Sequence, residues 1–416
     1  MKMTNRFLNE EIDFKLLTNG AKCYITPKAG FREKQAVLSV GAGSSDFKFL
    51  LNGVPTVYPV GIAHFLEHKM FEAPEGLEDR FSAFLSRGAD VNAYTNFYST
   101  SYYFTCQDNF EENLKMLIEM AQTPHITEES VEKEKGIIIQ EINQYADDPF
   151  WRGALGLLDA LYFENPVKHD VAGTAESVSA ITPALLYDCH ALFYAPRNMV
   201  LTVVGEVNPG EVFDIAEKYI NQRGTAPLAE RHSPPEPEYS RLRENAIELG
   251  ISRPFASIGF KDDPREGDHA SALAAGKVLA DMLAGPSTEF YSDLREKGLI
   301  DDACGIDYAA GRDFRYLTLA AATSEPRALG DALCGRLASA ELPPEAFERA
   351  KRKQLGKTLR IFNNIGHTAL AQADLLSHGK TVFDLSDAYE ALTLDDVERK
   401  RRFLSAEGRG AMSIVN

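Results

Sequence analysis

The sequence predicts an α+β fold in which two homologous domains are related by an internal duplication. Three observations support this prediction: the length of the chain, one proline-rich interruption, and an order of patterns that recurs after it. The 416 residues exceed what one hydrophobic core usually supports, which favours two domains of roughly 200 residues each. We expect a first domain at residues 1–221, a linker at 222–240 and a second domain at 241–416.

The interruption QRGTAPLAERHSPPEPEYS has four prolines among mixed charges and is typical of an extended linker. Before it, the apolar runs QAVLSVGAG and NMVLTVVGEV indicate buried strands, and the alternating TSYYFTC indicates a half-buried strand. The segment TEESVEKEKGIIIQEINQYA predicts a helix that Thr127 caps and that ends before Pro149.

The same order of patterns returns after the linker. FASIGF matches the first apolar strand, and LPPEAFERAKRKQLGKTLRI matches ITEESVEKEKGIIIQEINQY, beginning 342 − 126 = 216 residues later. A single repeat of this length indicates a duplicated domain, because solenoid repeats are only about 20–50 residues long.

Composition and charge exclude several classes of function. Lys and Arg total 44 and Asp and Glu total 61, so the net charge is 44 − 61 = −17. Such an acidic chain is a poor match for nucleic acid or an anionic membrane as a partner. The sequence has no run of 18 apolar residues and no apolar signal region at the N-terminus, so we expect a cytoplasmic protein. The five cysteines are scattered without metal-type spacing and fit a reducing compartment: Cys23, Cys106, Cys189, Cys304 and Cys334.

The stretch GIAHFLEHKMFEA places two histidines and a glutamate in an otherwise apolar segment. On a helix, His64 and His68 lie on one face a single turn apart, with Glu67 on the neighbouring edge. The rest of the segment is apolar nearly all round, which indicates a buried helix. Buried imidazoles beside a buried carboxylate are costly unless a partner neutralises them, and a divalent metal does so. The pattern therefore predicts a metal site.

Such a metal site needs a third protein ligand. In the helix VEKEKGIIIQEINQY, an apolar stripe includes Val131 and Ile138, and Glu134 and Glu141 lie seven residues apart on one edge of it. We expect at least one of these glutamates to face the histidines. Two histidines and a carboxylate are the ligand set of a catalytic zinc with a fourth position open for water, and Glu67 is placed to take the proton of that water.

These residues resemble a known family. HFLEH has the inverted zincin order His-x-x-Glu-His, and essentially the full chain resembles the pitrilysin/insulinase family of zinc peptidases, in particular the short bacterial two-domain members similar to processing peptidases. The matching stretches include GIAHFLEHKMFE, VEKEKGIIIQEINQYADDPFWR, HDVAGTAESVSAIT and FYAPRNMVLTVVG. The resemblance implies two homologous domains, each a mainly antiparallel sheet covered by helices.

The resemblance also implies a role for each site residue. It implies one Zn²⁺ per chain with three ligands, a catalytic base and a supporting carboxylate: His64, His68 and Glu141, then Glu67, then Glu134. Asn92 and Ala93 match the edge strand along which such enzymes bind the backbone of a peptide substrate.

The second half of the chain lacks the metal-binding pattern. VLADM stands where the first half has HFLEH. At the 216-residue offset, Glu134 is replaced by Ala350 and Glu141 by Lys357. We therefore expect that this half does not hold zinc.

In this family the second half often provides an Arg and, seven positions on, a Tyr that help to hold substrate at the metal. Here Arg295 is followed at that spacing by Asp302, and the next tyrosine is Tyr308. We expect either that Arg295 and Tyr308 bind substrate together, or that a partner chain supplies the pair. The partner would be a related subunit in a heterodimer, or a second copy in a homodimer.

These observations predict a zinc-dependent endopeptidase that cleaves peptides or unfolded segments in a chamber between its two domains. Two alternatives remain open. The first is a non-catalytic assembly subunit, although relatives of that kind usually lose the ligands. The second is a zinc lyase like the S-ribosylhomocysteine-cleaving enzyme, which has a His-x-x-Glu-His helix in a short single domain with a cysteine in its site.

Overall fold

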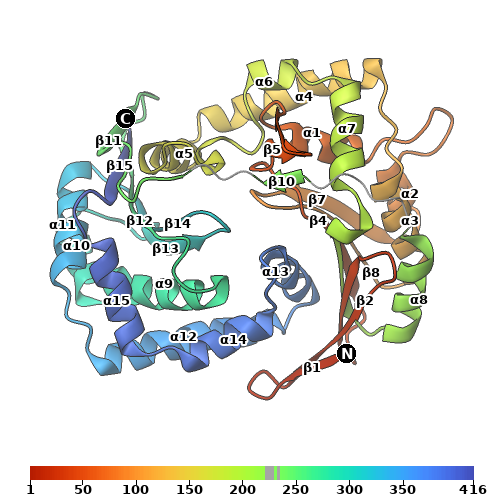
Figure 1. The fold of residues 1–416 in the computed structure, drawn as a ribbon. Helices are drawn as coiled ribbons and strands as arrows, with labels where there is room; N and C mark the ends of the chain where they lie inside the picture. The colour runs from red at the N-terminus through yellow and green to blue at the C-terminus, as the bar shows by residue number, and fades with distance from the viewer. Residues whose placement is uncertain (221–228, 232–234) are drawn as a thin grey trace. The chain divides into compact units, whose positions relative to one another are not determined.

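The computed structural model describes residues 1–220, 229–231 and 235–416 (Figure 1). Most of the predicted linker, residues 222–228 and 232–234, therefore lies outside the described residues. The chain divides into two compact units, each made of three segments. The first contains Met1–Ile142, Asp170–His232 and Leu359–Phe383, and the second contains Asn143–His169, Ser233–Thr358 and Asp384–Asn416.

A seven-stranded sheet forms the centre of the first unit. In order across the sheet, its strands are β1 (Lys2–Asn5), β2 (Glu10–Leu16), β3 (Lys22–Pro27), β9 (Met199–Gly205), β4 (Lys34–Val40), β8 (Thr100–Cys106) and β7 (Ala89–Thr95). β3 and β9 run parallel, and the other neighbours are antiparallel. A smaller sheet has the order β10 (Ala229–Arg231), β5 (Lys48–Leu51) and β6 (Val54–Val57).

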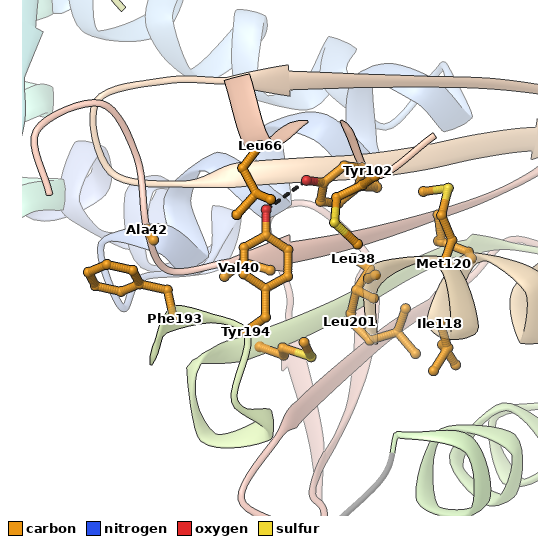
Figure 2. Packing of buried hydrophobic residues seen from close by; sticks show 14 of the residues in the cluster. Leu38, Val40, Ala42, Leu66, Tyr102, Ile118, Met120, Phe193, Tyr194 and Leu201 are labelled. Carbon is orange, nitrogen blue, oxygen red and sulfur yellow. Dashed lines mark hydrogen bonds between the residues drawn. The ribbon is translucent and has the colours of Figure 1, made fainter. Parts of the chain in front are cut away.

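Helices cover both faces of the large sheet. One face packs against a core to which helices contribute: α1 (Ile62–Lys69), α3 (Phe110–Gln122), α7 (Pro183–Phe193) and α8 (Pro209–Tyr219). α13 (Ile365–Ser377) covers the opposite face against β4 and β9. The alternation of β4 explains this division, because Leu38 belongs to the first core and Val37 packs with Ala369 of α13. Figure 2 shows the first core, where the hydroxyls of Tyr102 and Tyr194 share a hydrogen bond of 2.7 Å.

The remaining helices of the first unit lie at its periphery or carry site residues. They are α2 (Arg80–Leu85), most of α4 (Glu128–Ala146), α6 (Ala175–Ser179) and the short 3-10 helix η2 (Pro196–Asn198). α2 contacts β7, the outer strand of the sheet.

A five-stranded sheet forms the centre of the second unit. Its order is β11 (Glu244–Ile247), β15 (Gly410–Val415), β12 (Phe255–Asp262), β14 (Arg315–Ala322) and β13 (Gly305–Ala310). α5 (Pro149–Leu161) covers one face, where Gly259 lets Leu157 approach so closely that a Cβ would meet it at 2.9 Å. The other helices are α9 (His269–Ala284), α10 (Glu289–Glu296), α11 (Pro326–Ser339), α12 (Pro344–Ile361), α14 (Val382–Ala391) and α15 (Leu394–Leu404), with η1 (Pro166–Lys168).

The two units repeat one topology, which confirms the predicted α+β duplication. The order β3-β9-β4-β8-β7 in the first unit corresponds to β11-β15-β12-β14-β13 in the second, with a parallel pair at the same place. Four pairs of elements begin 216 residues apart, at 89 and 305, 110 and 326, 128 and 344, and 149 and 365: β7 with β13, α3 with α11, α4 with α12, and α5 with α13. This shift places residues 280–284, ADMLA, opposite HFLEH, so the predicted alignment of HFLEH with VLADM was wrong by two residues.

Two corresponding helices are exchanged between the halves of the chain. α5 precedes the predicted linker in sequence but packs on the sheet of the second unit, and α13 follows the linker but packs on the sheet of the first. Segments 143–169 and 359–383 therefore belong to a different unit from their neighbours in sequence. None of the helices in the described residues combines the length and the apolar character that crossing a membrane requires.

Candidate metal centre

Helix α1 carries the two histidines and is positioned at its start by Gly61. This residue has φ of 89°, a left-handed conformation that glycine adopts at little cost. A Cβ here would lie 2.4 Å from the carbonyl oxygen of Ala172, so the site has no room for a larger residue. Phe65 is fully buried in the core. Its burial fixes the rotation of the helix and turns His64 and His68 to one side.

The two imidazoles meet at their Nε2 atoms. His64 Nε2 and His68 Nε2 are 3.3 Å apart, and the ring centroids are 4.6 Å apart. Burial, together with the neighbouring His68 ring, lowers the pKa of His64 to about 4. His64 is therefore neutral at physiological pH and can offer a lone pair to a metal.

Helix α4 brings Glu141 to both histidines. Its rotation is set by Val131 and Ile138, which are buried as the apolar stripe predicted. One carboxylate oxygen of Glu141 lies 3.8 Å from His64 Nε2, and the other lies 3.7 Å from His68 Nε2. The two helices thus present three potential ligand atoms to one point.

Glu134 lies beside this group, on the far side of the His68 ring. Its Oε1 is 3.0 Å from His68 Nδ1, so the carboxylate accepts a hydrogen bond from that nitrogen. Burial raises the pKa of the Glu134 carboxyl, but the bond to His68 and the charge of Lys69 outweigh burial and the net shift is downward. For His68 burial lowers the pKa, while the hydrogen bond and charge of Glu134 reverse the direction and raise it. This bond leaves His68 Nε2 as the ligand atom.

Glu67 is buried next to the same group. The hydroxyl of Thr95, on β7, donates a hydrogen bond of 2.6 Å to Glu67 Oε2. Burial raises the pKa of Glu67 to about 7, and the bond from Thr95 opposes that rise. A carboxyl group whose pKa is near neutrality suits proton transfer at physiological pH.

The geometry of the three ligand atoms fits a zinc ion. The atoms offered by His64, His68 and Glu141 all lie within 4.8 Å of one another. A tetrahedral zinc with bonds of about 2.0–2.1 Å separates its ligand atoms by about 3.3–3.4 Å. The observed separations are 3.3, 3.7 and 3.8 Å, so a small movement of Glu141 would complete the coordination. Two nitrogens and one carboxylate leave the fourth position open, as in catalytic zinc sites.

Asn92 and Ala93 lie on β7, which is the outer strand of its sheet. Asn92 is exposed, and its side chain accepts a hydrogen bond of 2.8 Å from the backbone N–H of Ala93. Thr95, which bonds to Glu67, follows on the same strand. The two predicted substrate-binding residues are therefore on the strand that leads to the candidate metal centre.

The two predicted substrate contacts of the second half are not presented together. Arg295 forms an ion pair of 2.8 Å with Asp302, at the position where a tyrosine was expected. Tyr308 is fully buried, and its hydroxyl bonds to Asp262 and lies 3.4 Å from Lys400 Nζ. A hydroxyl held in the interior is not available to a peptide. The structure therefore does not support Tyr308 as a substrate contact.

Sequence reasoning missed two residues that support the site. Thr95 holds the carboxylate of Glu67, and Lys69 is fully buried with its Nζ 3.9 Å from Glu134 Oε2 and in an ion pair with Glu72. A signal for Lys69 was available, because a lysine inside a buried apolar helix needs a carboxylate partner. Thr95 is 28 residues from Glu67 in sequence, and no local pattern joins the two.

The comparisons with known proteins agree with this fold and site. Residues 56–175 match the family described as Insulinase (Peptidase family M16), and residues 180–354 match the Peptidase M16 inactive domain. The chain is 35% identical over 407 residues to a Bacillus subtilis protein named uncharacterized zinc protease YmfH, which covers 94% of this chain and 93% of that one. It is also 30% identical over 169 residues to mitochondrial-processing peptidase subunit beta of Caenorhabditis elegans, over 39% of this chain and 36% of that one.

Solved structures extend the comparison. An M16-like peptidase from Alicyclobacillus acidocaldarius has a TM-score of 0.92 at 32% identity, over 98% of each chain. A protease from Helicobacter pylori has a TM-score of 0.83 at 18% identity, over 98% of this chain and 99% of that one, which is a likeness of fold alone. The fold is thus that of the two-domain M16-like peptidases. The chain belongs to peptidase family M16, the insulinase family, and its relatives are named zinc proteases.

Proposed function

We propose that the protein is a zinc-dependent endopeptidase that binds one zinc ion per chain and cleaves peptides or unfolded segments of proteins. One observation carries the proposal. His64, His68 and Glu141 converge from two helices on one point, and the buried carboxylate of Glu67 lies on the same helix as the two histidines. This combination provides both a metal-ligand set and a proton acceptor.

In the proposed mechanism each side chain has one task. His64, His68 and Glu141 hold the zinc ion, and Glu134 keeps His68 in the orientation in which Nε2 is free. Zinc supplies a Lewis acid and lowers the pKa of a coordinated water from 15.7 towards about 7. Glu67 accepts the proton of that water and later delivers it to the leaving amine. Thr95 fixes the carboxylate of Glu67 through its hydrogen bond.

The proposed substrate lies along β7. An outer strand has unpaired backbone groups on one side, and an extended peptide can bond to them as an added strand. Asn92 and Ala93 would contact the peptide backbone near the metal. We further propose that the two domains enclose a chamber, so that peptides and unfolded segments enter and compact proteins do not.

Peptide cleavage with and without a chelator tests the proposal. The purified protein should contain zinc and cleave a mixture of unstructured peptides at internal bonds. Chelator should abolish cleavage, and added zinc should restore it. Glu67→Gln should retain zinc and lose cleavage, whereas Glu75→Gln, an exposed glutamate near the same motif, should match the wild type. Cleavage that persists in Glu67→Gln would reject the proposed role of that residue.

We also propose that the chain acts with a partner that supplies an Arg and Tyr pair. Arg295 is paired with Asp302, and the hydroxyl of Tyr308 is engaged inside the second unit, which supports this view. The partner is a related subunit in a heterodimer, or a second copy in a homodimer. The pure chain should be a slow peptidase that a related subunit with the pair accelerates. Full activity of the chain alone, lost in Arg295→Ala, would contradict the proposal.

The two alternative functions have no observation in their favour. A non-catalytic assembly subunit has no need of the converged ligand set, and the duplicated fold of family M16 differs from the short single domain of the lyase. A cytoplasmic location is likewise a proposal, supported by five free thiols, three of them buried.

A further inference from the structure

The second unit has a pocket of about 450 Å³ at the place that corresponds to the metal centre of the first unit. The shift of 216 residues that relates β7 to β13 and α4 to α12 identifies the corresponding residues. The counterparts of the three proposed ligands all line the pocket: Ala280, Ala284 and Lys357, in place of His64, His68 and Glu141. The pocket lies between α9, α12 and β13.

The replacements change both the space and the charge of the site. Two methyl groups stand where the first unit has two imidazole rings, so the volume of those rings is open. A lysine stands where the first unit has a carboxylate. A site that gathers lone pairs around a cation has thus become a hollow with a positive group at its edge.

The lysines of the pocket outnumber its carboxylates. Lys277 pairs with Asp307 at 2.5 Å, and Lys353 pairs with Asp281. Lys357 has neither a hydrogen bond nor an ion pair among the described residues, and it is exposed at the pocket. Three lysines against two aspartates give the pocket an excess of one positive charge, in a chain whose net charge is −17.

A neutral donor lies beside the unpaired lysine. Gln354 is 6% exposed and lines the pocket one turn before Lys357 on α12. Its amide can donate a hydrogen bond to an anion that Lys357 attracts. A carboxylate suits this pair, because an ammonium group and an amide can each take one of its two oxygens.

We propose that this pocket binds a carboxylate of a peptide ligand, with Lys357 as its ion-pair partner. The carboxylate comes from an acidic side chain or from a peptide C-terminus. The choice of a peptide as its carrier rests on the proposed function, but binding needs neither Glu67 nor cleavage. The second unit, which lacks the metal-binding residues, thus anchors the ligand.

Peptide binding to the zinc-loaded full-length Glu67→Gln chain tests this. The probe is a fluorescent, N-acetylated, C-amidated peptide with two glutamates among neutral residues. The same peptide with glutamine is its control, and a neutral peptide with a free C-terminus forms the third arm. Fluorescence anisotropy gives the dissociation constants at two salt concentrations.

The decisive variants are Lys357→Glu and Lys297→Glu, which change the net charge equally. Lys297 is an exposed lysine of the second unit outside the pocket. Lys357→Glu should weaken binding of at least one carboxylate peptide about ten-fold or more, because a hydrogen bond to a charged group is worth roughly 1.5–3 kcal/mol. Lys357→Arg should retain binding, and Lys297→Glu should have little effect.

The arm that shows the dependence on Lys357 identifies the source of the carboxylate. Equal binding of the glutamine peptide and the two carboxylate peptides, or equal weakening by Lys357→Glu and Lys297→Glu, would overturn the proposal. Melting temperatures check that each variant is folded. Zinc content and chelator-sensitive cleavage are measured separately on the wild type, so a failure of the proposed function is distinguishable from a failure of the pocket.

Discussion

Glu134 accepts a hydrogen bond of 3.0 Å from Nδ1 of His68, and the other nitrogen of the same ring lies 3.3 Å from His64 Nε2. An ionised carboxylate can only accept, so the proton of the imidazole must be on Nδ1. Glu134 therefore selects the tautomer of His68 whose Nε2 lone pair points at the candidate metal position. This makes Glu134 a positioning residue.

Removing the charge of Glu134 should weaken zinc binding. We expect Glu134→Gln to lose about 10–100-fold in zinc affinity, which is the usual effect of losing the partner of a metal-binding histidine. Competition with a chromophoric chelator measures the affinity. Glu132→Gln, on the same helix but with a side chain 61% exposed, is the matched control. Equal affinities of the two variants would show that Glu134 does not support His68.

The zinc content should depend on the three converging residues. Metal analysis should give about one zinc per wild-type chain, and near zero for His68→Ala and for Glu141→Ala, because two ligands alone bind weakly. The last comparison also distinguishes Glu141 from Glu134, since Glu134→Gln should still bind zinc at high concentration. Two zinc ions per chain, or an unchanged content in Glu141→Ala, would disprove the assignment.

Thr95 should control the protonation of Glu67. Its hydrogen bond lowers the pKa of Glu67 against the effect of burial, so Thr95→Val should raise that pKa further. A base must be unprotonated to act, and the acid limb of kcat/KM should therefore move to higher pH. Thr95→Ser keeps the hydroxyl and should keep the wild-type profile. The idea fails if the profile of Thr95→Val coincides with that of the wild type.

Tyr308 should contribute to stability and leave catalysis unchanged. Tyr308→Phe removes the hydroxyl that bonds to Asp262 and leaves a buried carboxylate with one partner fewer. We expect a loss of about 1–3 kcal/mol in unfolding free energy. The melting temperature should fall, while the peptidase rate per folded molecule stays the same. A large drop in kcat without a change in melting temperature would restore Tyr308 as a substrate contact.

Glu236 should make the second unit sensitive to acid. Burial raises its pKa, but the hydrogen bond from Lys261 and those from the backbone N–H groups of Glu164 and Phe163 outweigh burial, so the net shift is downward. A carboxyl whose pKa is lower in the folded state stabilises the protein above its ordinary pKa near 4.5 and loses that contribution as pH falls through the folded value.

Glu236→Gln should therefore be less stable than wild type at pH 7, and the gap should close as the pH falls below about 4.5. Melting temperatures between pH 7 and pH 3.5 measure this. Glu238→Gln is the control, because its carboxylate is 63% exposed. A gap that stays constant over this range would contradict the assignment.

The sequence predicted much of the site because its signals are local. The spacing of His64 and His68 needs only a helix, and the burial of Val131 and Ile138 follows from their period on α4. The choice between the two glutamates is different in kind. Periodicity puts Glu134 and Glu141 on the same edge, and only the packing of α4 against α1 separates a potential ligand from a supporting group.

Other features depend on contacts between distant segments. No pattern in α5 or α13 says which sheet the helix covers, since an amphipathic helix packs equally well on any apolar face. Tyr308 illustrates a second difficulty. A tyrosine near the expected spacing looked suitable for substrate, but the alternation of β13 turns its side chain inward towards Asp262.

The exchange of α5 and α13 has a consequence for the ancestry of the chain. Before the duplication, a single ancestral half had one such helix and one such sheet. If the helix already covered the sheet of another copy, the ancestor was a domain-swapped homodimer, and gene fusion later joined its two copies. Fusion made the exchange obligatory within one polypeptide and freed one copy from the need to keep its metal ligands. The loss of histidines from α9 could then accumulate without loss of the dimeric architecture.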